Sequence, residues 1–316
     1  MRRRVGAAVR RGIGQHREVL STDLVRVRDL VPDFLACLRA CDGVPAEQWP
    51  ALWRSRYLDR HPGVFAALDE AGEWSRPDDL GDILVRLRDE DADLAARSAA
   101  VRALLPDGIR AVAEALDWTA DGDPVDCVVL VGLHRANGWA DLLDGRFALF
   151  LAVEQLGPPG DDPLLVLHET AHVLHDRLAA IRDWPPHGVA NALFTEGLAT
   201  QVSAETAPGR TDAAYLWFGR PGYRTWLDTC RRRWPEILDR IGADLDATDA
   251  EHHAPYFLMR DSPLAGDLPK RCGYLVGLAV VRRLRAEHPL ADIARWPLDR
   301  VVDEVRRSLR ALRAAA

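Results

Sequence analysis

Residues 160–181 read GDDPLLVLHETAHVLHDRLAAI and carry the strongest structural signal in the chain. Asp162 is a typical N-cap residue and Pro163 suits the first helical position, so together they predict the start of a helix. His168 and His172 lie four residues apart, just over one helical turn, and their imidazoles therefore project from the same face. Two imidazoles on one helix face can bind one metal ion together.

Glu169 completes a His-Glu-x-x-His motif over residues 168–172. Zn²⁺ suits two imidazoles and a carboxylate, and a fourth position then remains for a water molecule. The metal lowers the pKa of this water to near neutrality, and Glu169 beside it can act as the general base. The alternative interpretation is a helix with two surface or core histidines and a solvated glutamate.

A third metal ligand should follow the motif. One class of such enzymes uses HExxHxxGxxH, but His175 stands at its glycine position and Leu178 at its third histidine, so that class is excluded. The other class takes a glutamate from the next helix, some 20 or more residues further on. Glu196 lies 24 residues after His172 and fits this second class.

The segment 188–205, GVANALFTEGLATQVSAE, predicts that next helix. A turn at Asp183-Trp184-Pro185-Pro186 followed by an antiparallel helix would return Glu196 to the level of the histidines. Gly197 would let the two helices pack closely. Taken alone, Glu196 could also be a capping or solvated carboxylate.

Two apolar runs precede the motif helix, and the first of them is rich in β-branched residues. Residues 124–133 (PVDCVVLVGL) and 146–156 (RFALFLAVEQL) predict two strands, with Asn137-Gly138 as a possible hairpin turn between them. Residues 246–267 predict an irregular loop. Helical periodicity marks four further stretches, 49–72, 78–105, 268–289 and 297–314. The predicted fold class is therefore α+β, mostly α, with a small sheet before the motif helix and helical N-terminal and C-terminal parts.

The chain divides by pattern into three parts. Residues 1–15 predict a flexible basic arm. Residues 16–120 predict a helical part, in which 17–24 (REVLSTDL) form a short strand that runs into a helix capped by Ser21, Thr22 or Asp23. Residues 121–316 carry the motifs and predict the catalytic part, which we expect to form one continuous compact unit with 16–120.

Composition narrows the class of protein further. The chain has 316 residues, of which 48% are hydrophobic, so a sizeable core can be buried. Its net charge of -7 argues against nucleic acid as a partner. No stretch reaches the roughly 20 apolar residues that a membrane span needs. Five unpatterned cysteines and the absence of a signal-peptide pattern predict a reduced, cytoplasmic protein.

HETAH at 168–172 followed by EGLAT at 196–200 resembles the gluzincin superfamily, the thermolysin-like zinc peptidases. More narrowly, the chain resembles a bacterial family of predicted Zn-dependent proteases of unknown function. Three softer similarities support this, and they lie at 53–65 (WRSRYLDRHPGVF), 131–140 (VGLHRANGWA) and 272–281 (CGYLVGLAVV, which contains GYxxG). The resemblance implies a zincin-like fold, a Zn²⁺ cofactor held by His168, His172 and Glu196, and Glu169 as catalytic base.

The same resemblance does not determine which residues orient the histidine ligands. An Asp four residues after the glutamate ligand orients a histidine in thermolysin-like enzymes, but Thr200 stands there in this chain. Thr200, Ser203 or Glu205 would have to substitute for it. His175, one turn beyond His172, is either a second partner of the ligands or an exposed side chain.

Peptide hydrolysis also needs a donor for the developing oxyanion. Tyr274 in GYLVG is the first candidate, and a core tyrosine at a helix start is the equal alternative. His252, His253 and Tyr256 are rivals in a polar segment that could overhang a cleft. Arg271 could hold a substrate carboxylate.

An edge strand pairs with the substrate backbone in gluzincins. Asn137, Gly138 and Trp139 lie where such an edge would end, and we hypothesise that they contact substrate.

Three functions are compatible with these motifs. The first is a zinc-dependent hydrolase, more narrowly a peptidase. The second is a zinc enzyme acting on a small amide or another small molecule, for which a deep closed pocket rather than an open groove would be expected. The third is a binding or regulatory protein with a non-catalytic metal, for which four protein ligands would be typical. The expected partner is a peptide or a small molecule, with neither nucleic acid nor membrane.

Overall fold

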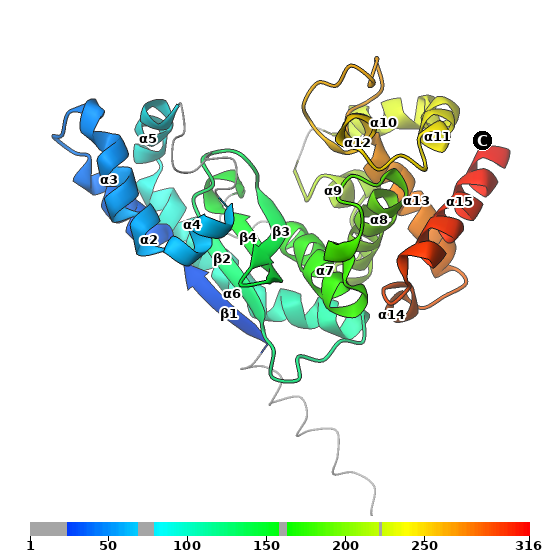
Figure 1. Cartoon of the computed structure of the whole chain (residues 1–316), viewed down its shortest axis with the longest axis horizontal. Helices are drawn as coiled ribbons and strands as arrows, with labels where there is room; N and C mark the ends of the chain where they lie inside the picture. Colours follow the sequence, from blue (N-terminus) through cyan, green and yellow to red (C-terminus); the bar gives the residue numbers. More distant parts are fainter. Residues whose placement is uncertain (1–23, 69–78, 158–162, 221–222) are drawn as a thin grey trace, which may run out of the picture.

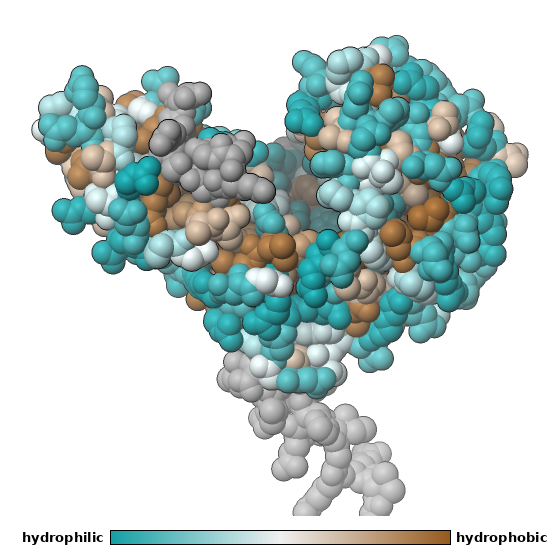
Figure 2. All heavy atoms as spheres, viewed as in Figure 1, coloured by the Kyte–Doolittle hydropathy of each residue, from teal (hydrophilic) through white to brown (hydrophobic). Residues whose placement is uncertain are grey.

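The computed structural model describes residues 24–68, 79–157, 163–220 and 223–316. A small sheet and helix α7 lie at the base of the molecule, and an arm of helices rises on either side (Figure 1). The space-filling view is hollowed between the two arms (Figure 2). The predicted basic arm and the predicted strand at 17–24 fall almost entirely outside the described residues.

The sheet has four strands in the order β1-β2-β4-β3. β1 pairs parallel with β2 and β2 parallel with β4, whereas β3 runs antiparallel to β4 at the sheet edge. The strands are β1 (Val25–Asp29), β2 (Val125–Leu130), β3 (Gly138–Leu143) and β4 (Arg146–Ala152). The two strands that the sequence predicted, β2 and β4, are the central ones; β2 is fully buried, and β4 is buried from Ala148 onward.

The two edge strands correct the sequence-based prediction. Residues 25–29 were expected to be helical, but β1 pairs residue by residue with β2. Residues 138–143 were expected to be part of a connection, but they form β3. The hairpin turn is Asp144-Gly145 rather than Asn137-Gly138. Both turn residues have positive φ, 53° and 79°, as a two-residue hairpin loop with the right-handed twist of strands requires.

Helix α7 (Leu164–Ala179) is the central element of the molecule. It contacts β3, β4, α6 and α8, so almost every residue from Leu164 to Asp176 is buried. The enclosure includes polar side chains such as Glu169, Thr170 and Asp176 as well as the apolar ones. The helix begins at Leu164 with Pro163 as N-cap, one residue later than predicted, and Asp162 lies outside the described residues.

The N-terminal arm is helical, as predicted. Its long helix α6 lies under the sheet and also contacts α7 and α8, which ties the arm to the motif helices. Four aromatic rings, Phe34, Trp53, Tyr57 and Phe65, form the core of the arm. The helices are α2 (Val31–Ala40), α3 (Trp49–Arg56), α4 (Pro62–Leu68), α5 (Leu80–Arg88) and α6 (Asp91–Ala115).

The C-terminal arm is built on α8, which contacts α7, α13 and α15. One of its helices, α12 (Ala250–Phe257), lies where an irregular loop was predicted. Asp249 caps α12 by accepting hydrogen bonds from the main-chain N–H groups of Glu251 and His252. The helices are α8 (Val189–Thr206), α9 (Asp212–Leu216), α10 (Arg224–Arg232), α11 (Trp234–Ala243), α12, α13 (Cys272–Arg285), α14 (Leu290–Ile293) and α15 (Leu298–Ala314).

The described helices include none that combines the length and the apolar character required to cross a membrane. All five cysteines are buried free thiols. Burial raises the pKa of Cys37 to about 12, with the neighbouring Cys41 adding to the effect, so this thiol stays protonated and is a poor metal ligand.

Candidate metal centre

The side chains of His168, His172 and Glu196 converge between α7 and α8. The Nε2 atoms of His168 and His172 are 3.1 Å apart, and Glu196 Oε2 lies 3.1 Å from the first and 3.5 Å from the second. The His168 side chain is buried, whereas the side chains of His172 and Glu196 are 13% and 20% exposed. The turn between the helices thus returns Glu196 to the level of the motif histidines.

These three separations match a zinc site. With metal–ligand bonds of 2.0–2.2 Å, two ligands of a tetrahedral zinc ion lie about 3.4 Å apart. The three donor atoms can therefore form one face of such a tetrahedron, and no further His, Cys, Asp or Glu among the described residues joins this group. They are the one group of three or more potential metal-binding side chains of this kind among the described residues.

The charges of these three side chains are coupled to one another. Burial alone would raise the pKa of Glu196, but the charges and hydrogen bonds of His172 and His168 hold it well below its usual range. Burial alone would lower the pKa of His172, but the Glu196 carboxylate outweighs this and raises it. Two imidazole nitrogens facing each other at 3.1 Å repel unless a proton or a metal ion lies between them.

Glu169 lies on α7 directly beside the donor group and is 7% exposed. Burial raises the pKa of Glu169, an effect that the charges of His168 and His172 oppose. A Cβ atom added to Gly138 would lie 3.3 Å from Glu169 Cγ. The start of the edge strand β3 therefore lies against the predicted catalytic base.

The segment that leads into β3 is fixed by a buried carboxylate. Glu154 accepts hydrogen bonds from the main-chain N–H groups of Gly132 and His134 at 2.8 and 2.9 Å. The main-chain oxygen of Asn137 accepts from Ala152 N at 2.9 Å, which begins the pairing of β3 with β4. Sequence reasoning did not single out Glu154, because a lone glutamate after a strand carries no pattern.

Tyr274 comes close to the donor group. Its ring centroid is 6.4 Å from that of His168, with the two planes inclined by only 24°. Burial and the negative charges of Glu196 and Glu169 raise the pKa of Tyr274. The phenol therefore keeps its proton and can donate a hydrogen bond.

Of the three other candidate oxyanion donors, only one lies near the donor group. His253 lies at the edge of the site, where its ring stacks 4.6 Å from Phe257 and burial lowers its pKa to about 4. His252 instead points to the surface, where Nδ1 lies 2.9 Å from the Asp249 carboxylate. The Tyr256 hydroxyl donates to Asp244 in the core of the C-terminal arm, so it does not face the donor group.

The expected supporting partners of the histidines take other roles. The Thr200 hydroxyl donates to the main-chain oxygen of Glu196 at 2.8 Å, within its own helix, and Ser203 does the same to Ala199. Glu205 pairs with Arg285 at the surface. Among the described residues, the buried Nδ1 atom of His168 has no hydrogen-bond partner.

His175 is enclosed between the rings of Trp184 and Phe194, at 5.5 and 5.6 Å. Burial, and secondarily the charge of His172, lowers the pKa of His175 to about 3, so the ring is neutral. It fills space behind the motif helix.

Aromatic residues after α9 form a wall that the sequence did not indicate. The ring of Phe218 lies 4.9 Å from that of His168 in an edge-on arrangement. Phe218 has a φ of 54°, which is uncommon for a residue with a bulky side chain. An ion pair of 2.7 Å between Asp212 and Arg282 anchors α9 to α13 and so holds this wall in place. The aromatic composition of 215–226 is visible in the sequence, but nothing in it relates these rings to the motif helix.

The glycines of EGLA and GYLVG bring α8 and α13 into close contact. A Cβ atom at Gly197 would overlap the main-chain oxygen of Gly277, and one at Gly277 would overlap that of Leu193. Gly197 was expected to approach α7, but its close neighbour is α13. The glycine contact places Tyr274 beside His168 while Glu196 faces the same space from α8.

Replacing Gly277 by alanine should therefore lower the free energy of unfolding by about 1–3 kcal/mol, because two helix backbones must move apart. Gly81→Ala is the matched control, since a Cβ there meets no atom within 4 Å and helix propensity favours alanine. Urea unfolding of both variants measures the contrast. Equal stability of the two variants would show that α8 and α13 are not in backbone contact.

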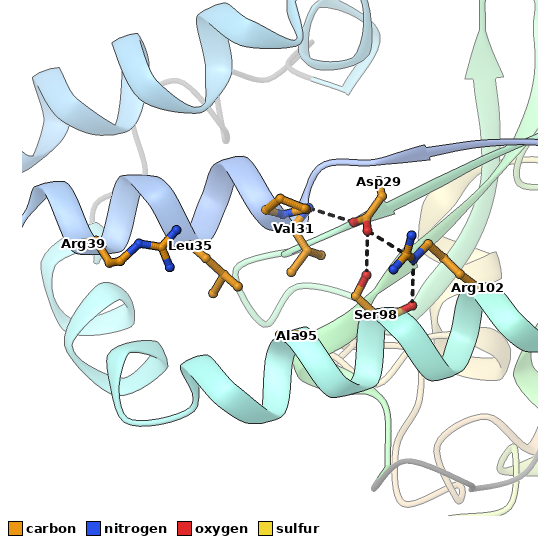
Figure 3. Close-up of a pocket in the computed structure, with 8 residues that line it drawn as sticks. Asp29, Val31, Leu35, Arg39, Ala95, Ser98 and Arg102 are labelled. Atoms are coloured by element: carbon orange, nitrogen blue, oxygen red, sulfur yellow. Dashed lines mark hydrogen bonds and ion pairs between the residues drawn. The ribbon is translucent and has the colours of Figure 1, made fainter.

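A separate pocket of about 250 Å³ lies between α2 and α6, away from the donor group. The Asp29 carboxylate there accepts hydrogen bonds from Val31 N at 3.0 Å and Ser98 Oγ at 3.0 Å, and pairs with Arg102 at 3.2 Å (Figure 3). These contacts join the end of β1 to two helices, so Asp29 stabilises the fold of the arm.

Comparison of the chain with family models, curated proteins and solved structures finds no match. The resemblance to the gluzincins and the zincin-like fold that it implies stay predictions.

Proposed function

We propose that the protein is a zinc-dependent hydrolase, and more narrowly a peptidase. The observation that carries this proposal is the tetrahedral spacing of His168 Nε2, His172 Nε2 and Glu196 Oε2. Three protein donors leave one position for water or substrate, which is typical of catalytic rather than structural zinc sites. A buried carboxylate on the same helix, Glu169, supplies the general base that hydrolysis needs.

When bound, zinc would activate water and polarise the carbonyl group that is attacked. Glu169 takes a proton from the attacking water as the new C–O bond forms. It then gives this proton to the amide nitrogen as the C–N bond breaks, so the products are a carboxylic acid and an amine. Tyr274 donates a hydrogen bond to the oxygen that becomes negative during the attack.

The surroundings of the site favour a peptide over a small molecule. The hollow between the two arms is open in the space-filling view, and β3 and α7 lie at its base (Figures 1 and 2). β3 is an edge strand whose outer side pairs with no strand among the described residues. An extended peptide can add to such an edge through main-chain hydrogen bonds.

Elemental analysis and a cleavage screen test the proposal. We expect one zinc per chain in the purified protein, together with cleavage of a peptide library that a chelator abolishes and added zinc restores. Absence of zinc even after reconstitution would contradict the proposal of a zinc-dependent hydrolase and favour a binding protein. Bound zinc with hydrolysis of small amides alone would favour the second function.

Asn137 is expected to contribute to substrate binding. Its side-chain Oδ1 accepts a hydrogen bond from Gly138 N at 3.1 Å and fixes the first residue of β3. Asn137→Ala should raise KM by about 2- to 10-fold, which corresponds to one hydrogen bond, with zinc content unchanged. Asp299→Ala removes a similar local bond, to Arg300 N at 2.8 Å, in α15 and serves as control. Unchanged kinetics in Asn137→Ala would remove this role.

A further inference from the structure

Arg271 is a cation held among aromatic rings at the start of α13. Its guanidinium carbon lies 4.0 Å from the ring centroid of Tyr274, 4.8 Å from that of Trp217 and 5.3 Å from that of Phe218. The residue has a φ of 61° and is the N-cap of α13, so the backbone turns sharply at this point. Two of these rings, Tyr274 and Phe218, also contact His168.

The hydrogen-bonding groups of Arg271 are almost unused. Within the described part of the chain, its one hydrogen bond runs from Nη2 to Leu216 O at 3.5 Å, the long limit for such a bond. The buried Nε atom has no partner there. A guanidinium has five N–H donors in one plane, and aromatic rings over its faces leave these donors directed outward.

The charge of Arg271 lies close to the donor group. Its guanidinium carbon is 4.0 Å from the ring centroid of Tyr274, and the Tyr274 centroid is 6.4 Å from that of His168. Arg271 is half-buried and its Nε atom is buried without a partner among the described residues, so an anion bound here would complete its hydrogen bonding.

We propose that Arg271 binds a carboxylate of the substrate, so that the substrate class is peptides with a carboxylate close to the bond that is cleaved. A guanidinium and a carboxylate match in shape and form two parallel hydrogen bonds. The carboxylate is that of the peptide C-terminus or of an acidic side chain. The inference rests on the proposed function for the statement that the bound molecule is a substrate.

A role of Arg271 in tuning Glu169 alone makes a different prediction. It would change the reaction of every substrate by the same factor, whether or not the substrate carries a carboxylate. Recognition of a carboxylate changes only the ligands that have one. Ligands that differ in this group alone therefore separate the two roles.

The test is calorimetric titration of the full-length protein with three peptides, before and after chelator treatment. The peptides are acetyl-Gly-Gln with a free carboxylate, its C-terminal amide, and the amide of acetyl-Gly-Glu. We expect a carboxylate to strengthen binding by about 10- to 100-fold over the uncharged amide. Tight binding of the free-carboxylate peptide assigns the terminus, and tight binding of the glutamate amide assigns the side chain. The chelator-treated protein contains no metal, so binding measured with it cannot come from a direct bond between the carboxylate and the metal.

Arg271→Gln should abolish the preference, and Arg271→Lys should retain part of it, because lysine keeps the charge without the fork of donors. Arg283→Gln on the exposed face of the same helix is the control and should behave as wild type. Thermal melting checks that each variant folds, and the lysine variant keeps the test valid if glutamine destabilises the arm. Equal binding of all three peptides by wild type, or a preference that survives in Arg271→Gln, would overturn the proposal. Because binding is measured without cleavage, a negative cleavage screen would contradict the peptidase function and leave this result intact.

Discussion

Replacing Glu196 by alanine is expected to remove stably bound zinc from the protein and hydrolysis with it. The variant keeps both imidazoles but loses the one negatively charged donor of the three, which lies 3.1 and 3.5 Å from their Nε2 atoms. Loss of a residue that merely supports a ligand weakens zinc binding by about 10- to 100-fold, so loss of the ligand itself should cost more than about 100-fold. Elemental analysis after dialysis against a weak chelator measures this.

Glu205→Ala is the matched control, because it removes a carboxylate from the same helix at a surface ion pair with Arg285. It should retain the full zinc content. A Glu196→Ala protein that folds and still holds one zinc per chain would exclude Glu196 as the third ligand.

The sequence could predict the donor group because helix geometry fixes it. The four-residue spacing of His168 and His172 places both rings on one face of any α-helix. The short turn before α8 then brings Glu196 to the same level, and the three donor atoms do converge. These relations depend on local geometry and on one helix reversal, so one sequence suffices to predict them.

The edge strands and α12 could not be predicted with the same security. VRVRD at 25–29 alternates with the period of a strand, but only its pairing with β2, about 100 residues later, makes it one. β3 exposes part of both faces and lacks the apolar run by which β2 and β4 were recognised. Residues 246–267 were predicted to be an irregular loop, but the Asp249 cap stabilises a single short helix, α12, which contains Pro255.

The residues around the donor group depend on contacts between distant segments. Gly197 and Gly277 were both visible as glycines in helices, but only the packing of α8 against α13 shows that each makes room for the other backbone. Arg271 is likewise surrounded by the rings of Trp217, Phe218 and Tyr274, which come from two segments more than 50 residues apart. The sequence suggested Arg271 as a carboxylate-binding residue, but nothing in the sequence related it to the rings of Trp217 and Phe218.

Replacing Glu169 by glutamine should lower kcat by about 10²- to 10⁴-fold, the usual contribution of a general base, with zinc content unchanged. Glutamine has the same size and shape as glutamate, so the contact with Gly138 and the burial of the side chain are preserved. It cannot accept a proton from the attacking water. Single-turnover kinetics on a peptide from the cleavage screen, with zinc measured in the same sample, provides the test.

Asp176→Asn is the control for Glu169→Gln. It distinguishes the loss of the general base from the loss of any buried carboxylate on α7. Asp176 is also buried on α7, but its carboxylate accepts hydrogen bonds from the main chain and side chain of Arg182 and closes the end of the helix. Its substitution should lower the melting temperature and leave kcat per folded molecule unchanged, whereas Glu169→Gln should do the reverse. If kcat of Glu169→Gln stays within a few-fold of wild type while zinc is bound, another group takes the proton. The peptidase mechanism proposed for this site would then be wrong even though the metal centre is present.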